Sequence, residues 1–361
     1  MIDPAEREPV HRYADRTTPR LERRKLGRTG LMVSELGFGA SPLGGVFRPD
    51  IDESDACQAV HEALYDYGIN VFDTSPYYGH TRSEVVLGKA LARLGERDDY
   101  VLATKVGRYG ADNFDFSKER VRQSVEASME RLGVRRLDLV QCHDVEFAPT
   151  RQIIVEEALP ALSQLRQEGI IGAIGITGYP LSIYRDVIES SPVELDAVLS
   201  YCHGCLCDTS LVDSGVLAYL TDCGIGVLNA SPLSMGLLTA RGPPSWHPAP
   251  ETLKQHCHNT AEWFAKQRAS TRACTDIAEL ALQFAVLRLG REGVASTLVG
   301  IDSTETLRRN AAALMAPLDE ELLAGVQRLL APVRNLSWSS GTPRSVWLND
   351  PPNNERPLAA T

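Results

Sequence analysis

The chain has 361 residues, of which 43% are hydrophobic and 23% charged, and its formal net charge is −10. This composition is typical of a globular protein with a sizeable core, and the acidic balance argues against nucleic acid or an anionic membrane as a partner. No apolar run approaches the roughly 20 residues that a transmembrane helix requires, so we expect a cytoplasmic protein.

The first 24 residues mix arginines with acidic side chains and lack the apolar segment of a signal peptide. They predict a disordered leader before one domain over residues 25–361. That domain begins with a β-hairpin around the glycine turn Gly27-Arg28-Thr29-Gly30. Short apolar runs without strict alternation then predict parallel strands covered on both faces, over residues 36–40, 71–73, 100–105, 137–142, 171–176, 197–201, 226–230 and 295–299.

Amphipathic segments separate these strands, and several of them end at a glycine. They predict helices over residues 54–67, 83–94, 117–132, 154–168, 181–189, 211–223, 275–289 and 303–315, with one further helix over 319–330. Eight β/α units after a plugging hairpin predict a closed (β/α)8 TIM barrel. A doubly wound sheet is the alternative, but Gly37-Phe38-Gly39-Ala40-Ser41-Pro42 lacks the third glycine of its fingerprint and leads into no helix.

Two regions do not fit the alternation of strands and helices. The polar, proline-rich stretch over residues 234–260 interrupts it, and a tail follows Arg334. We expect both to form lids over the mouth of the barrel. Trp246 and Trp338, one in each region, are candidate groups for stacking on a sugar, and the alternative is that they only pack the lids.

The eight cysteines are too sparse for a disulfide scaffold. Cys202-His203-Gly204-Cys205-Leu206-Cys207 looks like part of a metal site, but a structural zinc site needs four ligands. The other cluster, His256-Cys257-His258, lies in a stretch that reads as a polar loop. We therefore predict reduced thiols and no metal.

Ionisable residues follow three neighbouring strands at the end where barrel enzymes keep their functional groups. Asp73 ends the second strand and precedes Tyr78, Lys105 ends the third, and His143 follows the fourth. Each has an ordinary explanation alone, such as a helix cap or a satisfied core histidine, but together at one rim they predict a site. Asp73 would hold Lys105 as an ammonium, Lys105 would lower the pKa of Tyr78, and His143 would orient a substrate oxygen. Tyr78 would then exchange a proton with an oxygen whose carbon exchanges a hydride with a nicotinamide.

This order of four residues resembles the catalytic tetrad of the aldo-keto reductases, and the resemblance covers about residues 26–341. Within that superfamily the chain looks most like the branch that oxidises L-galactose in plant vitamin C synthesis. The matching stretches are residues 72–79, 199–203, 230–239, 242–248 and 332–338. The resemblance implies oxidation of the sugar at C1, with L-galactono-lactone and NADH as products and Tyr78 as the base.

The resemblance also implies where the cofactor binds, although the chain departs from the usual pattern around the nicotinamide. Gly178 and Ala230 replace an asparagine and a stacking tyrosine. Thr177 would keep one bond to the carboxamide, and Ser200 stands where a glutamine is common. The pyrophosphate would be held by Ser231 and by the backbone of Leu233, Met235 and Gly236.

The end of the eighth strand favours NAD over NADP. NADP-preferring relatives carry lysine or arginine at positions that align here with Gly300, Asp302 and Thr306. Asp302 and Glu305 would repel a 2′-phosphate, whereas Arg308 or Arg309 could approach it and keeps NADP as the alternative. The residues assigned to the adenosine end are Gly300, Asp302, Thr306, Arg309 and Asn310, the last of which resembles an adenine-binding asparagine.

We expect a small sugar as the partner of a monomer or weak homodimer. Asp144 and Tyr201 join the two tryptophans as candidate substrate residues. Another aldose of the L-fucose or D-arabinose type, or a pyridoxal or aldehyde substrate, is the alternative on the same tetrad. A nucleotide-sensing regulatory subunit is a third interpretation, against which the complete tetrad argues.

Overall fold

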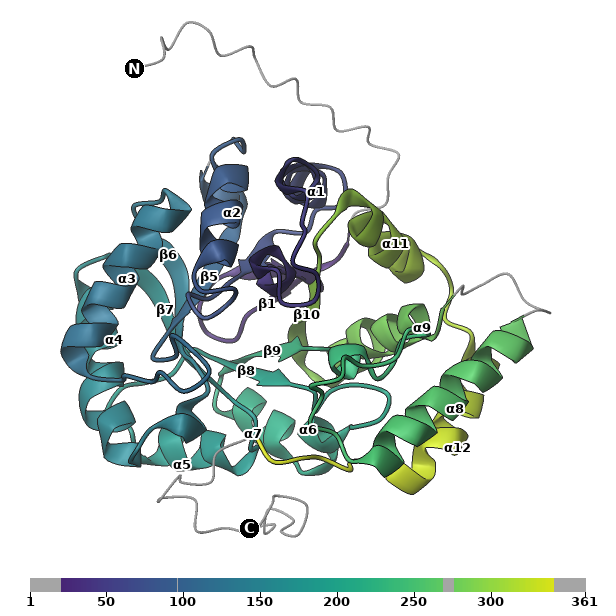
Figure 1. The fold of residues 1–361 in the computed structure, drawn as a ribbon. Coiled ribbons are helices and arrows are strands. Elements are labelled where there is room, and N and C mark those ends of the chain that lie inside the picture. Colours follow the sequence, from purple (N-terminus) through teal and green to yellow (C-terminus); the bar gives the residue numbers. More distant parts are fainter. Residues whose placement is uncertain (1–20, 96, 269–275, 341–361) are drawn as a thin grey trace, which may run out of the picture.

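The computed structural model describes residues 21–95, 97–268 and 276–340, and Figure 1 shows how they are arranged. The first elements form the expected hairpin, in which β1 (Arg23–Lys25) pairs antiparallel with β2 (Met32–Ser34). β1 begins at Arg23, which lies inside the predicted leader of residues 1–24. Arg24 in this strand is ion-paired with Glu35 at 2.8 Å. The rest of that leader, residues 1–20, lies outside the described residues.

Eight parallel strands close into a barrel in the order β10, β3, β4, β5, β6, β7, β8, β9. The helices surround it (Figure 1). The (β/α)8 architecture predicted from the sequence is therefore confirmed. The strands are β3 (Leu36–Gly39), β4 (Val71–Asp73), β5 (Val101–Val106), β6 (Leu137–Cys142), β7 (Ile171–Gly178), β8 (Ala197–Tyr201), β9 (Gly226–Ala230) and β10 (Val294–Gly300).

The helices agree closely with the sequence pattern. Asp52 caps α1 by accepting hydrogen bonds from the N–H groups of Ser54 and Asp55, and Asp319 caps α12 in the same way. The predicted helix over 211–223 is divided at Gly215, which has a φ of +78°. The helices are α1 (Glu53–Tyr65), α2 (Arg82–Leu91), α3 (Lys118–Leu132), α4 (Leu159–Gln167), α5 (Ser182–Ser190), α6 (Ser210–Asp213), α7 (Val216–Asp222), α8 (Glu251–Arg268), α9 (Ile277–Gln283), α10 (Leu289–Glu292), α11 (Thr304–Met315) and α12 (Glu320–Leu330).

Two apolar cores hold the barrel together. The larger one lies between the strands and the surrounding helices. The smaller one fills the barrel with alternate, inward-facing residues such as Leu139, Leu199 and Leu228, and includes Leu26 and Val33 of the hairpin. The hairpin therefore plugs the barrel, and the functional groups are confined to the opposite end.

The insertion over 234–260 is not loop-like throughout. Its second half begins α8, which packs on α12 at the outside of the barrel (Figure 1). A Cβ at Gly325 would lie 2.2 Å from the ring of Trp263, so the glycine of α12 admits this close contact. The polar residues that suggested a loop belong to the exposed side of a helix. No helix within the described ranges is long and apolar enough to cross a membrane.

Candidate active site

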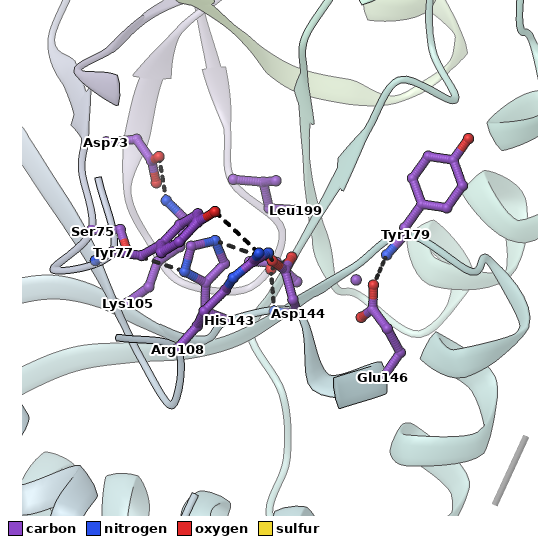
Figure 2. Close-up of polar contacts among 12 residues, drawn as sticks. Asp73, Ser75, Tyr77, Lys105, Arg108, His143, Asp144, Glu146, Tyr179 and Leu199 are labelled. Carbon is purple, nitrogen blue, oxygen red and sulfur yellow. Dashed lines mark hydrogen bonds and ion pairs between the residues drawn. The ribbon is translucent and has the colours of Figure 1, made fainter. Parts of the chain in front are cut away.

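Asp73 and Lys105 meet inside the rim of the barrel, as the sequence predicted. Asp73 is the last residue of β4, and Lys105 lies near the end of the adjacent β5. The Lys105 ammonium lies 2.5 Å from Asp73 Oδ1 (Figure 2). It donates a second hydrogen bond to the carbonyl oxygen of Thr74 at 2.9 Å. Gln141 of β6 donates to the other carboxylate oxygen at 3.3 Å. The pair is buried and fully engaged.

The electrostatic balance of this pair keeps the lysine charged. Burial by itself lowers the pKa of Lys105, but the charge of Asp73 and the hydrogen bonds with Asp73 and Tyr78 outweigh it and leave the pKa above its ordinary value. Burial raises the pKa of Asp73, and the adjacent ammonium acts in the opposite direction. A buried ammonium beside a phenol favours the ionised form of that phenol, which is the form that can accept a proton.

Tyr78 is placed beside this pair by a turn that only glycines permit. Gly79 has a φ of +61°, and a Cβ there would lie 2.0 Å from the carbonyl oxygen of Gly44 in the loop after β3. The Lys105 ammonium lies 4.9 Å from the centre of the Tyr78 ring, and the Tyr78 and His143 rings meet edge to face at 5.7 Å. All four predicted tetrad residues therefore come together.

The pKa of Tyr78 is raised rather than lowered. Burial is the largest cause, Lys105 lowers the pKa, and Asp73 and Asp144 raise it further. Lys105 thus acts in the predicted direction, but desolvation exceeds its effect. The phenol is therefore held neutral in the protein alone, and Lys105 limits the free energy needed to ionise it.

His143 is a neutral imidazole fixed by a residue that the sequence analysis did not identify. Its Nδ1 is hydrogen-bonded to Ser75 Oγ at 3.0 Å (Figure 2). Burial lowers the pKa of His143 to about 3, with Lys105 and Arg108 acting in the same direction against Asp144. The uncharged ring can therefore form a hydrogen bond with a molecule bound at the mouth of the barrel. The sequence signal for Ser75 was only its position between Asp73 and Tyr78.

The two residues expected near the nicotinamide carboxamide are not equally placed. Thr177 Oγ1 accepts a hydrogen bond from the Asp144 N–H at 2.8 Å and donates one to Asp144 Oδ1 at 3.2 Å. Ser200 alternates with the inward-facing Leu199 and Tyr201, and its hydroxyl faces Tyr184 behind the strand. The structure therefore does not bring Ser200 to the tetrad, because strand alternation turns it outward.

The loop after β9 has the backbone of an anion site. Ser231, Ser234, Met235 and Gly236 have φ values of +57°, +48°, +50° and +103°. The change of sign of φ from Leu233 (−92°) to Ser234 is the kind of step that gathers backbone N–H groups on one side, as in the nests that bind phosphate oxygens. The N–H groups of Ser234 and Gly236 already donate to the carbonyl oxygens of Ser231 and Leu233, at 2.8 and 3.1 Å. Leu233, also assigned to the pyrophosphate, lies within this loop. These residues fit the diphosphate of a dinucleotide.

The adenosine end also fits, because a buried polar atom lacks a partner there. Asn310 lies in α11 with 7% exposure, and its Nδ2 is without a hydrogen-bond partner. Ser303 caps the same helix by accepting a hydrogen bond from the Thr306 N–H at 3.2 Å. A Cβ at Gly300 would lie 2.8 Å from the ring of Pro42, so that strand end accepts no larger residue.

Charged residues near this end are already engaged. Asp302 Oδ2 accepts hydrogen bonds from Arg48 Nη2 at 2.7 Å and Nε at 3.1 Å. Asp302 Oδ1 accepts one from Thr306 Oγ1 at 2.9 Å. Arg308 forms two hydrogen bonds to Glu62, at 2.9 and 2.7 Å, and is held against α1, whereas Arg309 is exposed. The sequence analysis missed Arg48, whose loop comes some 250 residues before Asp302 in the chain.

The predicted substrate residues lie along one row of aromatic rings. Trp246 is exposed by 52% and meets Phe47 at 6.3 Å. The row continues through its stacked neighbour His247 to Trp338 in the tail, then to Tyr179 and to the inward-facing Tyr201, with ring centres 6.3, 5.0, 5.4 and 5.3 Å apart. The tail and the first half of the insertion therefore meet, and the row leads into the barrel.

Asp144, the remaining predicted substrate residue, belongs to a group that the sequence did not reveal. It is ion-paired with Arg108, which also donates a hydrogen bond to the Tyr77 hydroxyl at 3.1 Å (Figure 2). Glu146 lies nearby, fully buried, with Oε1 accepting the Tyr179 N–H at 2.9 Å and Oε2 without a partner. Burial and the charge of Asp144 raise the pKa of Glu146 to about 8.

The cysteine-rich stretches do approach each other. Cys205 Sγ and Cys207 Sγ are 3.5 Å apart, and the thiols of Cys207 and Cys257 are in contact. Within the described ranges, no group of three or more histidine, cysteine or acidic side chains is arranged to hold a metal ion. All seven described cysteines are free thiols.

Comparison with known proteins agrees with this geometry. The sequence model of the Aldo/keto reductase family matches residues 35–331. L-galactose dehydrogenase of Arabidopsis thaliana is 47% identical over 89% of this chain and 98% of its own length, and D-arabinose 1-dehydrogenase of Saccharomyces cerevisiae is 35% identical over 86% and 95%. An aldo-keto reductase from Bacillus halodurans, solved in its holo form, superposes with a TM-score of 0.69 at 27% identity, over 89% of this chain and 99% of that one. The chain therefore belongs to the aldo/keto reductase family, whose members are oxidoreductases that use nicotinamide cofactors.

Proposed function

We propose that this protein oxidises L-galactose at C1 to L-galactono-lactone and transfers the hydride to NAD, as in vitamin C (ascorbate) biosynthesis. The observation that carries the proposal is the buried Asp73–Lys105 pair set against Tyr78 and His143. The choice of sugar is supported by the 47% identity to the plant enzyme named for that substrate.

The tetrad supplies the proton chemistry of this reaction. Tyr78 takes the proton from the C1 hydroxyl, and the Lys105 ammonium stabilises the phenolate that must form first. The neutral His143 hydrogen-bonds the same hydroxyl and orients C1. A bound nicotinamide would accept the hydride. Because burial raises the pKa of Tyr78, oxidation should accelerate as the pH rises toward that pKa.

NAD is the proposed cofactor. The carboxylate of Asp302 lies on the turn where NADP-preferring relatives carry a cation, and Glu305 adds a second negative charge. Arg308, which could have favoured NADP, is held by both oxygens of Glu62. Arg48, which is paired with Asp302 and exposed by 55%, and the exposed Arg309 remain the cations on which the NADP alternative depends.

A second aldose is the alternative with specific support. The yeast relative is named for D-arabinose, and D-arabinose has the same configuration as L-galactose at C2, C3 and C4. A pocket that reads these three carbons would accept both sugars and also L-fucose, which lacks only the C6 hydroxyl of L-galactose. L-galactose and D-arabinose therefore differ only at C5 and C6, and the contacts that the site makes with these carbons decide which sugar it prefers.

Steady-state kinetics with NAD over a panel of sugars tests the proposal. We expect kcat/KM to be highest for L-galactose, measurable for L-fucose and D-arabinose, and near background for D-glucose and D-galactose. A higher kcat/KM for D-arabinose would replace the proposed sugar with the alternative. A preference for pyridoxal or a simple aldehyde would overturn the assignment to sugars, and the absence of turnover would favour a nucleotide-sensing role.

A further inference from the structure

A buried ion pair lies directly beside the tetrad and has no part in the chemistry described above. Arg108 comes three residues after Lys105, and Asp144 comes one residue after His143. The two side chains form an ion pair, in which Arg108 is exposed by 16% and Asp144 by 4% (Figure 2). Asp144 has a φ of +52°, a left-handed conformation that is uncommon for a residue with a side chain.

Aromatic rings and hydrogen bonds fix the orientation of the pair. The Arg108 guanidinium lies 4.0 Å from the ring centre of Tyr77, 5.2 Å from that of Phe114 and 5.0 Å from that of Phe147. Asp144 is hydrogen-bonded to Thr177 through both its N–H and its carboxylate. The Arg108 Nε is buried and lacks a hydrogen-bond partner. The pair is thus held rigidly, with a donor still unused.

The pair shares one space with the reacting groups. Asp144 Oδ2 lies 3.7 Å from His143 Nε2, and the charge of Asp144 adds to the effect of burial in raising the pKa of Tyr78. The pKa of Tyr201, which packs against the inner core of the barrel, is raised mainly by burial; the charge of Asp144 raises it further and that of Arg108 lowers it. A substrate oxygen held by Tyr78 and His143 therefore has this pair as its neighbour.

We propose that Arg108 and Asp144 bind the C2 hydroxyl of the sugar and restrict the enzyme to aldoses that carry a hydroxyl next to the reacting carbon. This inference rests on the proposed oxidation of a sugar at C1. A hydroxyl is both a donor and an acceptor, so it can donate to Asp144 while it accepts from Arg108. The hydroxyl groups on C1 and C2 of a pyranose project side by side, as do His143 and Asp144.

The same pair selects against other substrates. An aldehyde without an adjacent hydroxyl would displace water from Arg108 and Asp144 but would form no hydrogen bond with either. The loss of these hydrogen bonds costs binding free energy. A site built to hydrogen-bond a hydroxyl rejects an analogue that lacks it far more strongly than an apolar pocket does. Arg108 and Asp144 are positioning residues in this account, because they hold the sugar while Tyr78 and His143 act on C1.

The test is a cycle of two changes, one in the enzyme and one in the sugar. L-galactose and 2-deoxy-L-galactose are each assayed with the wild type and with Arg108→Met, which keeps an unbranched stem but removes the guanidinium and its charge. For the wild type, loss of the hydroxyl should lower kcat/KM by roughly 10- to 150-fold, the range for a hydrogen bond to a charged group. For Arg108→Met, the factor between the two sugars should be several times smaller than in the wild type, because one of the two partners of the hydroxyl is gone.

Binding is measured in parallel so that the result does not depend on turnover. Tyr78→Phe enzyme saturated with NAD is titrated calorimetrically with both sugars, with and without Arg108→Met. Arg122 provides a control for the substitution itself, because it forms an exposed arginine–carboxylate pair with Glu168, between α3 and the end of α4, away from the site. Arg122→Met should leave the ratio between the two sugars unchanged. If Arg108→Met does not fold, Asp144→Asn replaces it in the same cycle.

The outcomes separate the inference from the proposed function. A wild type that oxidises L-galactose while Arg108→Met or Asp144→Asn weakens both sugars by the same factor would overturn the inference and leave the function intact. A wild type that oxidises no aldose would overturn the function itself. A ratio between the sugars that collapses in the site variants but not in Arg122→Met supports the inference.

Discussion

The polar groups in the two halves of the barrel mouth differ in how completely they are already hydrogen-bonded within the protein. At the ends of β4, β5 and β6, the polar groups of Asp73, Lys105 and His143 are buried and hydrogen-bonded to one another or to their surroundings. Around the ends of β9 and β10, the backbone of the Ser231 loop is bent into left-handed conformations, and Asn310 keeps a buried atom without a partner.

This difference follows from what each half must do. Charge in the reacting half has to be arranged before substrate arrives, because a group that must reorganise during the reaction stabilises the transition state less. The cofactor brings its own phosphates and adenine, and these can complete the hydrogen bonds of the other half. We therefore expect changes in the first half to affect kcat and changes in the second to affect cofactor choice.

Tyr78→Phe should give the largest effect. Loss of the acid–base group is expected to lower kcat by about 10²–10⁴-fold, the usual contribution of such catalysis. The Kd for NAD, measured by fluorescence titration, should hardly change, because the hydroxyl lies in the reacting half. A variant that retains more than half of the wild-type kcat would show that Tyr78 is not the base.

Lys105→Met tests the electrostatics of the same half. Lys105 lowers the pKa of Tyr78 against the effect of burial, so its removal should raise that pKa further. The pH profile of kcat/KM for oxidation should shift to higher pH by roughly 1–3 units, as expected for the loss of an adjacent opposite charge. Lys105→Arg, which keeps the charge, should restore part of the profile. An active Lys105→Met enzyme with an unshifted profile would contradict this account.

Asp302→Ala tests the cofactor half. The wild type should have a higher kcat/KM with NAD than with NADP, and the variant should narrow this preference by about tenfold, the effect of removing a repulsion of about 1.4 kcal/mol. The kcat with saturating NAD should stay within about twofold, because Asp302 contributes nothing to the tetrad. A wild type that prefers NADP would contradict this prediction and would indicate that a cation such as Arg309 binds the 2′-phosphate.

Glu146→Gln should give the smallest effect, and it concerns stability. The folded-state pKa of Glu146 is about 8, above its ordinary value of 4.5. Between these values the unfolded chain releases a proton that the folded protein keeps, so folding stability decreases as the pH rises through this range. The glutamine variant lacks this loss, so its Tm relative to the wild type should increase between pH 5 and pH 8 by on the order of 2 °C or more.

Glu168→Gln is the matched control for that comparison. Glu168 is an exposed glutamate whose pKa is lowered by its hydrogen bonds with Arg122. Its substitution should leave the Tm difference from the wild type constant between pH 5 and pH 8. An equal trend in the two variants would show that Glu146 does not carry the effect.

The sequence was most informative where the chemistry lies at strand ends. Asp73, Lys105 and His143 each follow an apolar run, so the fold rule for barrels was enough to group them. Ser200 was placed by the resemblance and not by this rule, and a one-residue alternation decides whether such a strand residue faces the mouth or the helix behind it. The resemblance placed it at the cofactor, and the structure turns it toward Tyr184.

Long-range contacts between loops were beyond the sequence. Arg108 and Arg48 lie in loops without any periodic pattern, and their partners Asp144 and Asp302 are distant in the chain. α8 was missed for another reason, since its polar surface and the prolines before it resemble a loop. In each case the deciding information is which elements pack against the residue, and composition does not contain it.

In the proposed reaction, the hydrogen on C1 of the sugar passes directly to the cofactor. L-galactose deuterated at C1 tests it when the wild-type enzyme is incubated with the sugar and NAD, and both products are examined by NMR. We expect one deuterium on C4 of the reduced nicotinamide and an L-galactono-lactone that carries none. Recovery of the labelled sugar without any labelled NADH, under conditions where the enzyme binds NAD, would contradict it.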